Sequence, residues 1–558
     1  MYQELKDLPE DRQIEQIARA LVAVKSVNGT SGEVAIADKL EEIIRSYPYF
    51  TAHPDHVWTQ LLKHDALGRK SVFALLESPQ PTDRTVIYHG HMDTVGIEDF
   101  GALEPHALDP DYLRAYFSNY DKDSDVQQDA ASGDWLFGRG MLDMKSGDAV
   151  HLGNLLHYVR HPEELSGNLL VMFNPVEEND HEGIMEATNE LIRLKEEKHL
   201  NYLLAINGDF VSPLYKGDPT RYVYTGSAGK LLGCFYIRGR ETHVGETLAG
   251  IDPTLIASKI NEALNDRMDR AEKIDNEVIL PPSCLYFRDR KDFYNVQTAG
   301  AAYLYFNYFL YERTPKEVLD QLKGVAEQAC ADLKEFLSHQ YSAFAKNCGL
   351  KGNAPDWSAE VMTYGEFTDT LTASGIDVAK ITEDTVRKHP DRDFRQTSYR
   401  IIEALEAAAG DKRPKVIIFF APPYCPHNYL RDGVAAERHC DRLVDRILKK
   451  AEEKTGEPFA KKRFFPYLAD SSYLAMSESD KETDDIISNF PGWGRTYSIP
   501  LKQIHQLNIP VLDMGVYGKR AHTWMERLYK PYSYGVLPGL IREMTEAVLS
   551  DEKNGVTD

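Results

Sequence analysis

The sequence predicts an α/β protein in which helices flank a mostly parallel sheet and an α+β module interrupts the chain. Short runs of Val, Ile, Leu and Tyr, each bounded by Gly, Pro or Asn, are typical of buried strands. Stretches with the apolar spacing of helices separate these runs, which favours parallel pairing of the strands. A chain of 558 residues is also too long for a single core, so a second domain or a large insertion is expected.

The first predicted elements are two helices, because residues 10–47 place apolar side chains at helical spacing on either side of the turn-forming sequence NGTSGE. Strand-like runs then follow in RTVIYHGH, NLLVMFN and NYLLAIN. Between the first two runs, the polar stretch 109–134 has little to bury, and we expect it to form a surface excursion or a mobile lid.

The pattern changes after residue 215, and we expect the inserted module to span 216–427. Its elements alternate: a strand in GKLLGCFYIRGRETH, an amphipathic helix in DPTLIASKINEALNDRM, an aromatic strand in AAYLYFNYFLYE and a long helix in EVLDQLKGVAEQACADLKEFLSHQ. These elements lack the metal-type endings of the earlier strands, as expected of a separate α+β module. The flanking parts, 1–215 and 428–558, are predicted to form one domain with a frayed tail at 552–558.

Charge and composition narrow the range of partners. The chain has 64 Lys and Arg against 87 Asp and Glu, and its net charge of −23 repels phosphate backbones and anionic lipid. It has no apolar stretch long enough to span a bilayer and no secretion signal at its start. Six scattered cysteines without a CxxC pair favour reduced thiols. We therefore expect a soluble cytoplasmic protein that binds neither nucleic acid nor membrane.

Residues able to hold a divalent cation stand at the ends of predicted strands and in the glycine-rich turn GRGMLD. They are His91, Asp143, Glu178, Asp209 and His522. Taken singly, each has a structural explanation, such as a capped strand end, a solvated acidic turn or a core histidine. Together they form a nitrogen and oxygen donor set suited to two divalent ions, with zinc preferred and cobalt or manganese as alternatives. Ligands of open parallel sheets lie beyond the carboxyl ends of the strands, where these side chains would converge.

Two further acids are expected to serve the metal site. In an extended segment, positions i and i+2 face the same way, so Asp93 is placed to accept the spare ring N–H of His91. Glu177 and Glu178 are adjacent, and their repulsion favours one as a metal ligand and the other as a proton carrier with a shifted pKa. Glu526 follows His522 by four residues and shares its face if that segment is helical.

Five motifs occur in order along the chain: HMDTV, GRGMLDMKSG, PVEEN, NGD and AHTWME. In these motifs the chain resembles the di-zinc aminoacylase, dipeptidase and deacylase family, which includes carboxypeptidase G, acetylornithine deacetylase and succinyl-diaminopimelate desuccinylase. The resemblance covers about residues 13–345 and about 415 to the end. It implies a zinc-peptidase-like sheet flanked by helices, with the inserted module as a lid domain.

The resemblance implies roles for these residues. One zinc ion would be held by His91 and Asp209, the other by Glu178 and His522, and Asp143 would bridge the two. Asp93 would orient the site, and Glu177 would be the general base that deprotonates a metal-bridging water and then protonates the departing amine. The resemblance also implies a cis peptide bond between Asp143 and Met144.

In the module, the resemblance assigns His243 to oxyanion stabilisation, Asn295 to a place near the substrate and Arg313 to pairing with a substrate carboxylate. Lys519 and Arg520, just before His522, either contact an anionic substrate or are simply exposed. In dimeric relatives the lid histidine reaches the neighbouring subunit. The lid of this chain is about twice the usual size, which leaves both a homodimer and a monomer open.

The function predicted from these residues is metal-dependent hydrolysis of an amide bond in an N-acyl amino acid or a small peptide. The length and extra segments are similar to those of an arginine-utilisation protein, which implies a role in arginine catabolism. The alternative is a catalytically silent binding protein for an amino-acid derivative. A structural protein is a third class, which predicts no stoichiometric metal.

Overall fold

The computed structural model describes residues 1–349, 353–390, 393–467 and 469–550, and it divides into two compact units. The first unit comprises Met1–Ser227, Asn428–Met476 and the chain from Pro500 onward, and the second comprises Ala228–His427 and Ser477–Ile499. The sequence placed 477–499 in the flanking domain, whereas the structure packs it with the second unit. The tail at 552–558, predicted to fray, lies outside the described residues.

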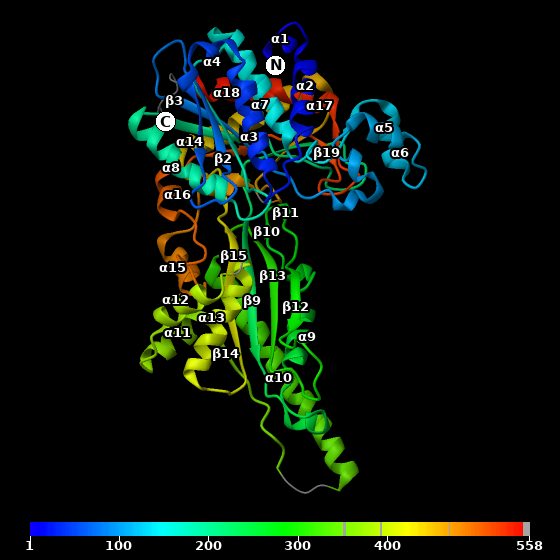
Figure 1. Ribbon diagram of the computed structural model, residues 1–558, viewed down its shortest axis with the longest axis vertical. Helices are drawn as coiled ribbons and strands as arrows, with labels where there is room; N and C mark the ends of the chain where they lie inside the picture. The colour runs from blue at the N-terminus through cyan, green and yellow to red at the C-terminus, as the bar shows by residue number, and fades with distance from the viewer. Residues whose placement is uncertain (350–352, 391–392, 468, 551–558) are drawn as a thin grey trace. The chain divides into compact units, whose positions relative to one another are not determined.

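Among the described residues, the first unit contains an eight-stranded mixed sheet (Figure 1). In spatial order its strands are β1 (Val57–Leu61), β2 (Lys70–Leu76), β5 (Asn168–Asn174), β3 (Arg84–His91), β6 (Asn201–Asn207), β18 (Val511–Asp513), β7 (Arg221–Tyr224) and β17 (Phe459–Lys462). The central strands β5, β3, β6 and β18 pair in parallel, whereas β1 and β2 add antiparallel partners at one edge. The predicted α/β class, with an inserted α+β region, is confirmed.

The central strands are apolar because both faces of the sheet are covered. All of β5 is buried, and so is every residue of β3 after Arg84, which is why these runs do not alternate with polar residues. On one face lie α7 (Lys145–Arg160) and α18 (Leu537–Leu549), and Tyr88 of β3 stacks on His151 of α7 there. The register pairs His91 with Asn174 and His89 with Asn207, so the three strands end at one edge.

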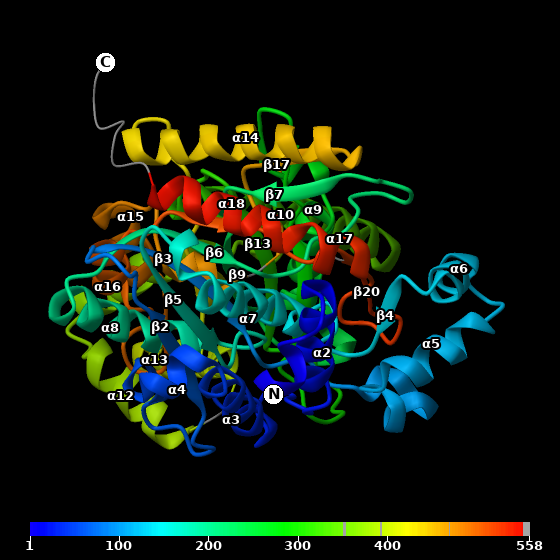
Figure 2. The same ribbon diagram turned by 90° about the horizontal axis from the view of Figure 1, so that it is seen from above.

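The remaining helices of the first unit surround this sheet. The predicted N-terminal pair is present as α2 (Glu10–Val22) and α3 (Gly32–Arg45), and α2 packs along α7. Figure 2 shows α14 (Ala435–Thr455) beside α18. The others are α1 (Tyr2–Leu5), α4 (Pro48–Ala52), α8 (Glu182–Glu197), α16 (Leu501–Leu507) and α17 (Lys530–Gly535).

The polar stretch before Asp143 is more regular than the sequence suggested. After the 3-10 segment Glu98–His106 it forms α5 (Pro110–Ser118) and α6 (Ser124–Ser132). The carboxylates of Asp109 and Asp123 accept backbone N–H groups in the first turns of these helices, as N-caps do. Strand β4 (Trp135–Phe137) then pairs with β20 (Arg527–Tyr529), which pairs with β19 (Gly518–Lys519).

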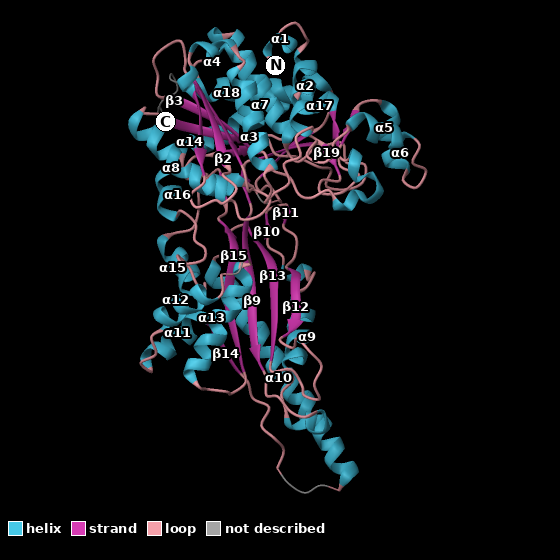
Figure 3. Ribbon diagram, viewed as in Figure 1, coloured by secondary structure: helices cyan, strands magenta, loops and turns pink. Residues whose placement is uncertain are grey.

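The second unit contains a five-stranded sheet among its described residues, with helices on both faces (Figure 3). Its strand order is β12 (Ser283–Asp289), β13 (Ala301–Leu310), β9 (Gly229–Arg238), β15 (Lys415–Cys425) and β14 (Glu360–Thr363). Alternate residues of β9 face opposite ways. Cys234 packs with α11 (Tyr364–Ala373) and α13 (Phe394–Ala409), whereas Gly233 lies against Leu322 of α10 (Pro315–Cys348).

The second unit also contains α9 (Pro253–Leu264), which packs on α10, and α12 (Val378–Lys388), which packs on α13. The segment 477–499 contributes α15 (Asp480–Ser488), which packs against α10. The backbone carbonyl of Asn489 accepts a hydrogen bond from the N–H of Phe420 in β15. Across the described part of the chain, no helix is both long and apolar enough to cross a membrane.

Candidate metal centre

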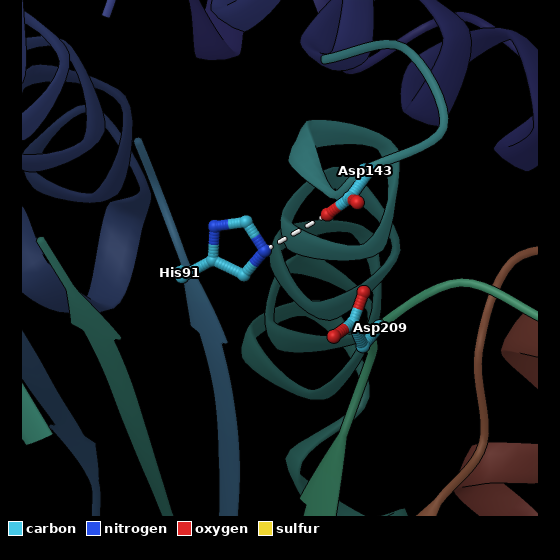
Figure 4. A group of neighbouring side chains, drawn as sticks. All are labelled: His91, Asp143 and Asp209. Carbon is cyan, nitrogen blue, oxygen red and sulfur yellow. Dashed lines mark hydrogen bonds and ion pairs between the residues drawn. The ribbon is translucent and has the colours of Figure 1, made fainter. Parts of the chain in front are cut away.

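Three of the predicted ligands meet at the carboxyl edge of the large sheet. His91 ends β3, Asp209 follows β6 by two residues, and Asp143 lies in the turn before α7 (Figure 4). The Nε2 atom of His91 lies 3.0 Å from Oδ1 of Asp143. One ligand atom from each of the three side chains lies within 4.8 Å of the others, and all three side chains are buried.

Asp143 also belongs to a second group of donors. Its other oxygen, Oδ2, lies 2.9 Å from Nε2 of His522, and that nitrogen lies 3.0 Å from Oε1 of Glu178. The structure thus brings all five predicted ligands together, with one carboxylate oxygen of Asp143 in each group. The His522 side chain is 47% exposed, so the cluster is open to solvent on that side.

The pKa shifts of the clustered side chains are those expected of a site that binds cations. Burial and the neighbouring Asp143 raise the pKa of Asp209 to about 8, and the same two causes raise the pKa of Glu178. Burial alone would lower the pKa of His522, but Asp143 and Glu178 raise it to about 11. The crowded carboxylates therefore favour the binding of protons or cations between them. Two imidazoles and three carboxylates form a donor set that fits a pair of divalent cations.

The turns that deliver these ligands adopt uncommon backbone conformations. Val176, which precedes the two glutamates, has φ 70°, and His522 has φ 60°. A positive φ is rare for a β-branched residue, and such strain concentrates at functional sites. A buried acid holds the first turn, because Oε1 of Glu33 accepts the N–H of Val176 at 3.1 Å. The peptide bond from Asp143 to Met144 is cis, as the family resemblance implies.

Asp93 is at the site, but its carboxylate does not make the predicted contact. The Nδ1 atom of His91 lies closest to the backbone carbonyl of Asp93, at 3.1 Å, and 3.7 Å from its carboxylate. The carboxylate instead accepts the backbone N–H groups of Glu177 and Glu178, each at 3.1 Å, and the side-chain amide of Asn28 at 2.8 Å. These three donors hold the carboxylate, so that Asp93 fixes the glutamate turn while its Oδ1 atom stays 3.7 Å from the imidazole nitrogen.

Glu177 lies beside the donor cluster. Its Oε2 atom is 3.9 Å from Nε2 of His91, and its Oε1 atom is 3.9 Å from Nδ1 of His181. Burial raises the pKa of Glu177 well above its ordinary value, although both histidines oppose that rise. Behind it, Nδ1 of His181 lies 3.2 Å from Oδ1 of Asp470. Sequence reasoning missed His181 and Asp470, which stand 289 positions apart; the only local signal was His181 four residues after Glu177.

Glu526 links the two groups of ligands, although not as a helical neighbour of His522. The segment 520–526 is a series of turns, and the Glu526 side chain is fully buried. Its Oε1 atom accepts the backbone N–H groups of Leu142 and Asp143 at 3.0 and 3.3 Å. Its Oε2 atom accepts from Arg139 at 2.6 Å. The loop that carries His522 therefore also fixes the turn that carries Asp143.

The predicted substrate residues have the following surroundings. In the second unit, Nδ1 of His243 accepts the N–H of Gly245, and a backbone bridge joins His243 to Gln297, whose side chain accepts from Asn295. Arg313 donates to the carbonyl of Arg270 and to the hydroxyl of Tyr308 in the same unit. In the first unit, Lys519 forms ion pairs with Asp125 and Asp129, which occupy its ammonium, whereas Arg520 is exposed.

Imidazoles and carboxylates at the carboxyl ends of central parallel strands, with a buried glutamate beside them, are the arrangement expected of a metallohydrolase. Residues 87–476 match the model of peptidase family M20/M25/M40, and the chain belongs to this family. The motif resemblance to metal-dependent peptidases and deacylases is therefore confirmed. So is the prediction that the chain is a hydrolase of C–N amide bonds.

Two relatives match along almost the whole chain. Protein RocB of Bacillus subtilis is 48% identical over 556 residues, which cover 100% of this chain and 98% of RocB. The uncharacterized protein YqjN of the same organism is 33% identical, with 96% of each chain covered. Among solved structures, a tripeptidase from Staphylococcus aureus shares the fold with a TM-score of 0.52 and 14% identity, covering 97% of this chain and 99% of that one.

Proposed function

We propose that the protein hydrolyses the amide bond of an N-acyl amino acid or a small peptide, with Glu177 as the proton carrier. The observation that carries this proposal is the place of Glu177 against the donor cluster, buried and 3.9 Å from the His91 nitrogen. A structural acid in the core would be expected to form a short ion pair. A carboxyl with a raised pKa beside a cation site is suited to take up and release a proton.

In the proposed mechanism, the two groups of donors would hold the cations, and Glu177 would transfer the proton. His91, Asp143 and Asp209 would hold one divalent cation, and Asp143, Glu178 and His522 the other. Bound cations would supply Lewis acidity toward the amide carbonyl and lower the pKa of water. Glu177 accepts the proton of the attacking water and returns it to the departing amine, while Asp93 keeps the glutamate turn in place.

His243 is proposed to donate a hydrogen bond to the oxyanion. Its Nδ1 atom accepts the N–H of Gly245 at 3.1 Å, so the hydrogen of the neutral ring lies on Nε2. A neutral N–H donor is suited to developing negative charge on a carbonyl oxygen. Asn295 belongs to the same strand-bridged loop and is proposed to contact the substrate.

For the ions we propose zinc, with cobalt or manganese as alternatives, because the donors are nitrogen and oxygen without sulfur. For the substrate we propose an arginine-related compound, used in arginine catabolism in the cytoplasm. A net charge of −23 favours the approach of a substrate with a guanidinium group over that of an anion.

We also propose that two copies associate through the second unit. Strand β12 is an edge strand of its sheet, and Phe287 on it is 43% exposed. The following loop exposes Phe293 and Tyr294 by 76% and 87%. Exposed aromatic groups at a sheet edge favour association with another chain, and a second copy is the simplest occupant. A monomer is the alternative state.

The test of the proposed function is hydrolysis of a panel of N-acyl amino acids and dipeptides, arginine compounds included, with added zinc, cobalt or manganese. We expect at least one substrate to be turned over by the natural protein. Glu177→Ala should retain bound metal and lose at least about 1000-fold in kcat, because its proton transfers are removed. Glu182→Ala, on the exposed start of α8, should keep full activity.

The outcome that contradicts the mechanism is a Glu177→Ala variant as active as the natural protein. The alternative, a silent binding protein, predicts tight binding of an amino-acid derivative with no turnover of any compound in the panel.

A further inference from the structure

The loop that carries His522 lies in a hairpin with an unfavourable charge arrangement. Its two strands, β19 and β20, pair Lys519 directly with Arg527. Two cations directly opposite each other in an antiparallel ladder repel. The guanidinium of Arg527 is also completely buried, which is costly unless carboxylates pair with it. The hairpin therefore needs negative charge from another part of the chain.

That charge comes from α6, in the excursion before Asp143. Asp125 and Asp129 are four residues apart and share one face of this helix. Each carboxylate contacts both cations: Lys519 at 2.9 and 2.8 Å, and Arg527 at 2.7 and 2.7 Å. The ring of Trp135, at the end of the excursion, lies under both cations. Four ion pairs with these aspartates thus offset the repulsion between Lys519 and Arg527.

The same excursion also holds the loop on the other side of His522. Trp524, two residues after the histidine, packs against Phe117 of α5 and Tyr120, with ring centroids 5.3 and 5.5 Å apart. Arg139 adds a link, because it binds both Glu526 and, at 2.7 Å, Asp99 of the 3-10 segment that precedes the excursion. Contacts with the excursion are therefore made both before and after His522 in the chain. They stabilise a loop in which the backbone of His522 has a strained, positive φ.

We propose that the α5–α6 excursion is a positioning clamp for the metal ligand His522. The proposal rests on the proposed function in one respect, that His522 binds a cation. Asp125, Asp129, Lys519 and Arg527 are positioning residues of this clamp, and Lys519 is not a substrate contact. Without the two aspartates, Lys519 and Arg527 repel, the hairpin opens, and the imidazole loses its place beside Glu178 and Asp143.

The test is a titration of the metal-free full-length protein with Co²⁺, followed by its visible absorption, which reports binding without any substrate. The double variant Asp125→Asn with Asp129→Asn is compared with the natural protein and with His522→Ala. Partners that orient a metal ligand typically contribute about 10-fold to 100-fold in affinity. We expect the aspartate variant to bind one of two Co²⁺ ions 10-fold to 100-fold more weakly, and His522→Ala to weaken the same ion.

The chain offers a matched control. Asp441 and Asp445, four residues apart on α14, hold Lys461 of β17 at 2.8 and 2.9 Å in the same way but away from the ligands. Asp441→Asn with Asp445→Asn should bind both Co²⁺ ions as the natural protein does. Circular dichroism confirms folding of each variant. The single change Asp125→Asn, at the more exposed aspartate, replaces the double variant if that one does not fold.

A rescue experiment separates clamping from general damage. Adding Lys519→Met and Arg527→Met to the aspartate variant removes both cations, so that neither their repulsion nor an unpaired buried guanidinium remains, and should restore most of the lost Co²⁺ affinity. The clamp is wrong if His522→Ala weakens Co²⁺ binding while the aspartate variant does not, or if removing both cations restores nothing. The proposed ligand set is wrong if His522→Ala leaves both ions bound, an outcome that overturns the clamp with it.

Discussion

At the scale of single residues, the turns of the candidate metal centre are held by buried acids that lie outside the proposed ligand set. Asp93 accepts the N–H groups of Glu177 and Glu178, and Glu526 accepts those of Leu142 and Asp143. Both carboxylates are completely buried. The turns that carry the proposed ligands are therefore held by hydrogen bonds to carboxylates, which are stronger than hydrogen bonds between neutral groups.

Glu526 gives a prediction of stability and activity together. Glu526→Ala removes the partner of the buried Arg139 and leaves two backbone N–H groups without an acceptor. Breaking such a buried pair costs about 3–5 kcal/mol in the free energy of unfolding. We expect Glu526→Ala to lower the melting temperature and the Co²⁺ affinity, as measured by calorimetry.

The conservative change Glu526→Gln keeps an acceptor for Leu142 and Asp143 and should retain most of the Co²⁺ affinity. As a control, Glu41→Ala breaks the partly exposed pair with Arg45 and should cost about 1 kcal/mol or less. Equal Co²⁺ affinities for Glu526→Ala and the natural protein would contradict the role given to Glu526.

At the scale of elements, the second unit contains a buried pair that joins two chain segments. His427 ends the main segment of this unit, and Glu478 stands near the start of the segment 477–499. Their side chains lie 2.8 Å apart, and the backbone N–H of His427 also donates to Glu478. Burial alone would lower the pKa of His427, but Glu478 raises it above 6.5, and His427 lowers the pKa of the buried Glu478 below 4.5.

These shifts predict how stability depends on pH. A raised histidine pKa stabilises the folded state below pH 6.5, and the effect is lost as pH rises through the raised value. A lowered glutamate pKa stabilises it above pH 4.5, and that effect is lost as pH falls through the lowered value. Glu478→Gln should therefore reduce stability most between pH 4.5 and 6.5, by about 3–5 kcal/mol.

Urea unfolding of the natural protein and of Glu478→Gln at pH 5.5 and pH 9 checks this prediction. Glu383→Gln is the control, because its pair with Arg495 is exposed and should matter little at either pH. A difference between Glu478→Gln and the natural protein that does not change with pH would show that the pair is not charged in the folded state.

The elements also show what the sequence reveals and what it does not. The convergence of His91 and Asp209 beyond the ends of β3 and β6 was predictable, because a run buried on both faces is apolar until it leaves the sheet. The helices α5 and α6 were missed because polar composition hid the N-cap signals of Asp109 and Asp123. The pairing of His181 with Asp470 was beyond prediction, because no local pattern relates positions 289 residues apart.

At the scale of the whole molecule, the exposed edge of the second unit predicts an oligomeric state. We expect light scattering to give the mass of a dimer for the natural protein. Phe287→Glu, on the edge strand β12, should give a monomer, because it places a charge in an apolar contact. Phe336→Glu, at a 45% exposed position on α10, should remain dimeric. A natural protein that is monomeric at micromolar concentration would contradict the proposed association.

The position of β18 has a consequence for synthesis on the ribosome. This strand lies between β6 and β7, although it follows both of them in the chain and comes after the entire second unit. A nascent chain that has just completed β7 thus has a gap where an inner strand belongs, and it lacks His522. Domains generally fold as units and N-terminal ones first during translation, but here the second unit finishes before the first. With the proposed ligand set, the site would be completed only when translation is almost finished, and until then the strand edges on both sides of the gap stay unpaired.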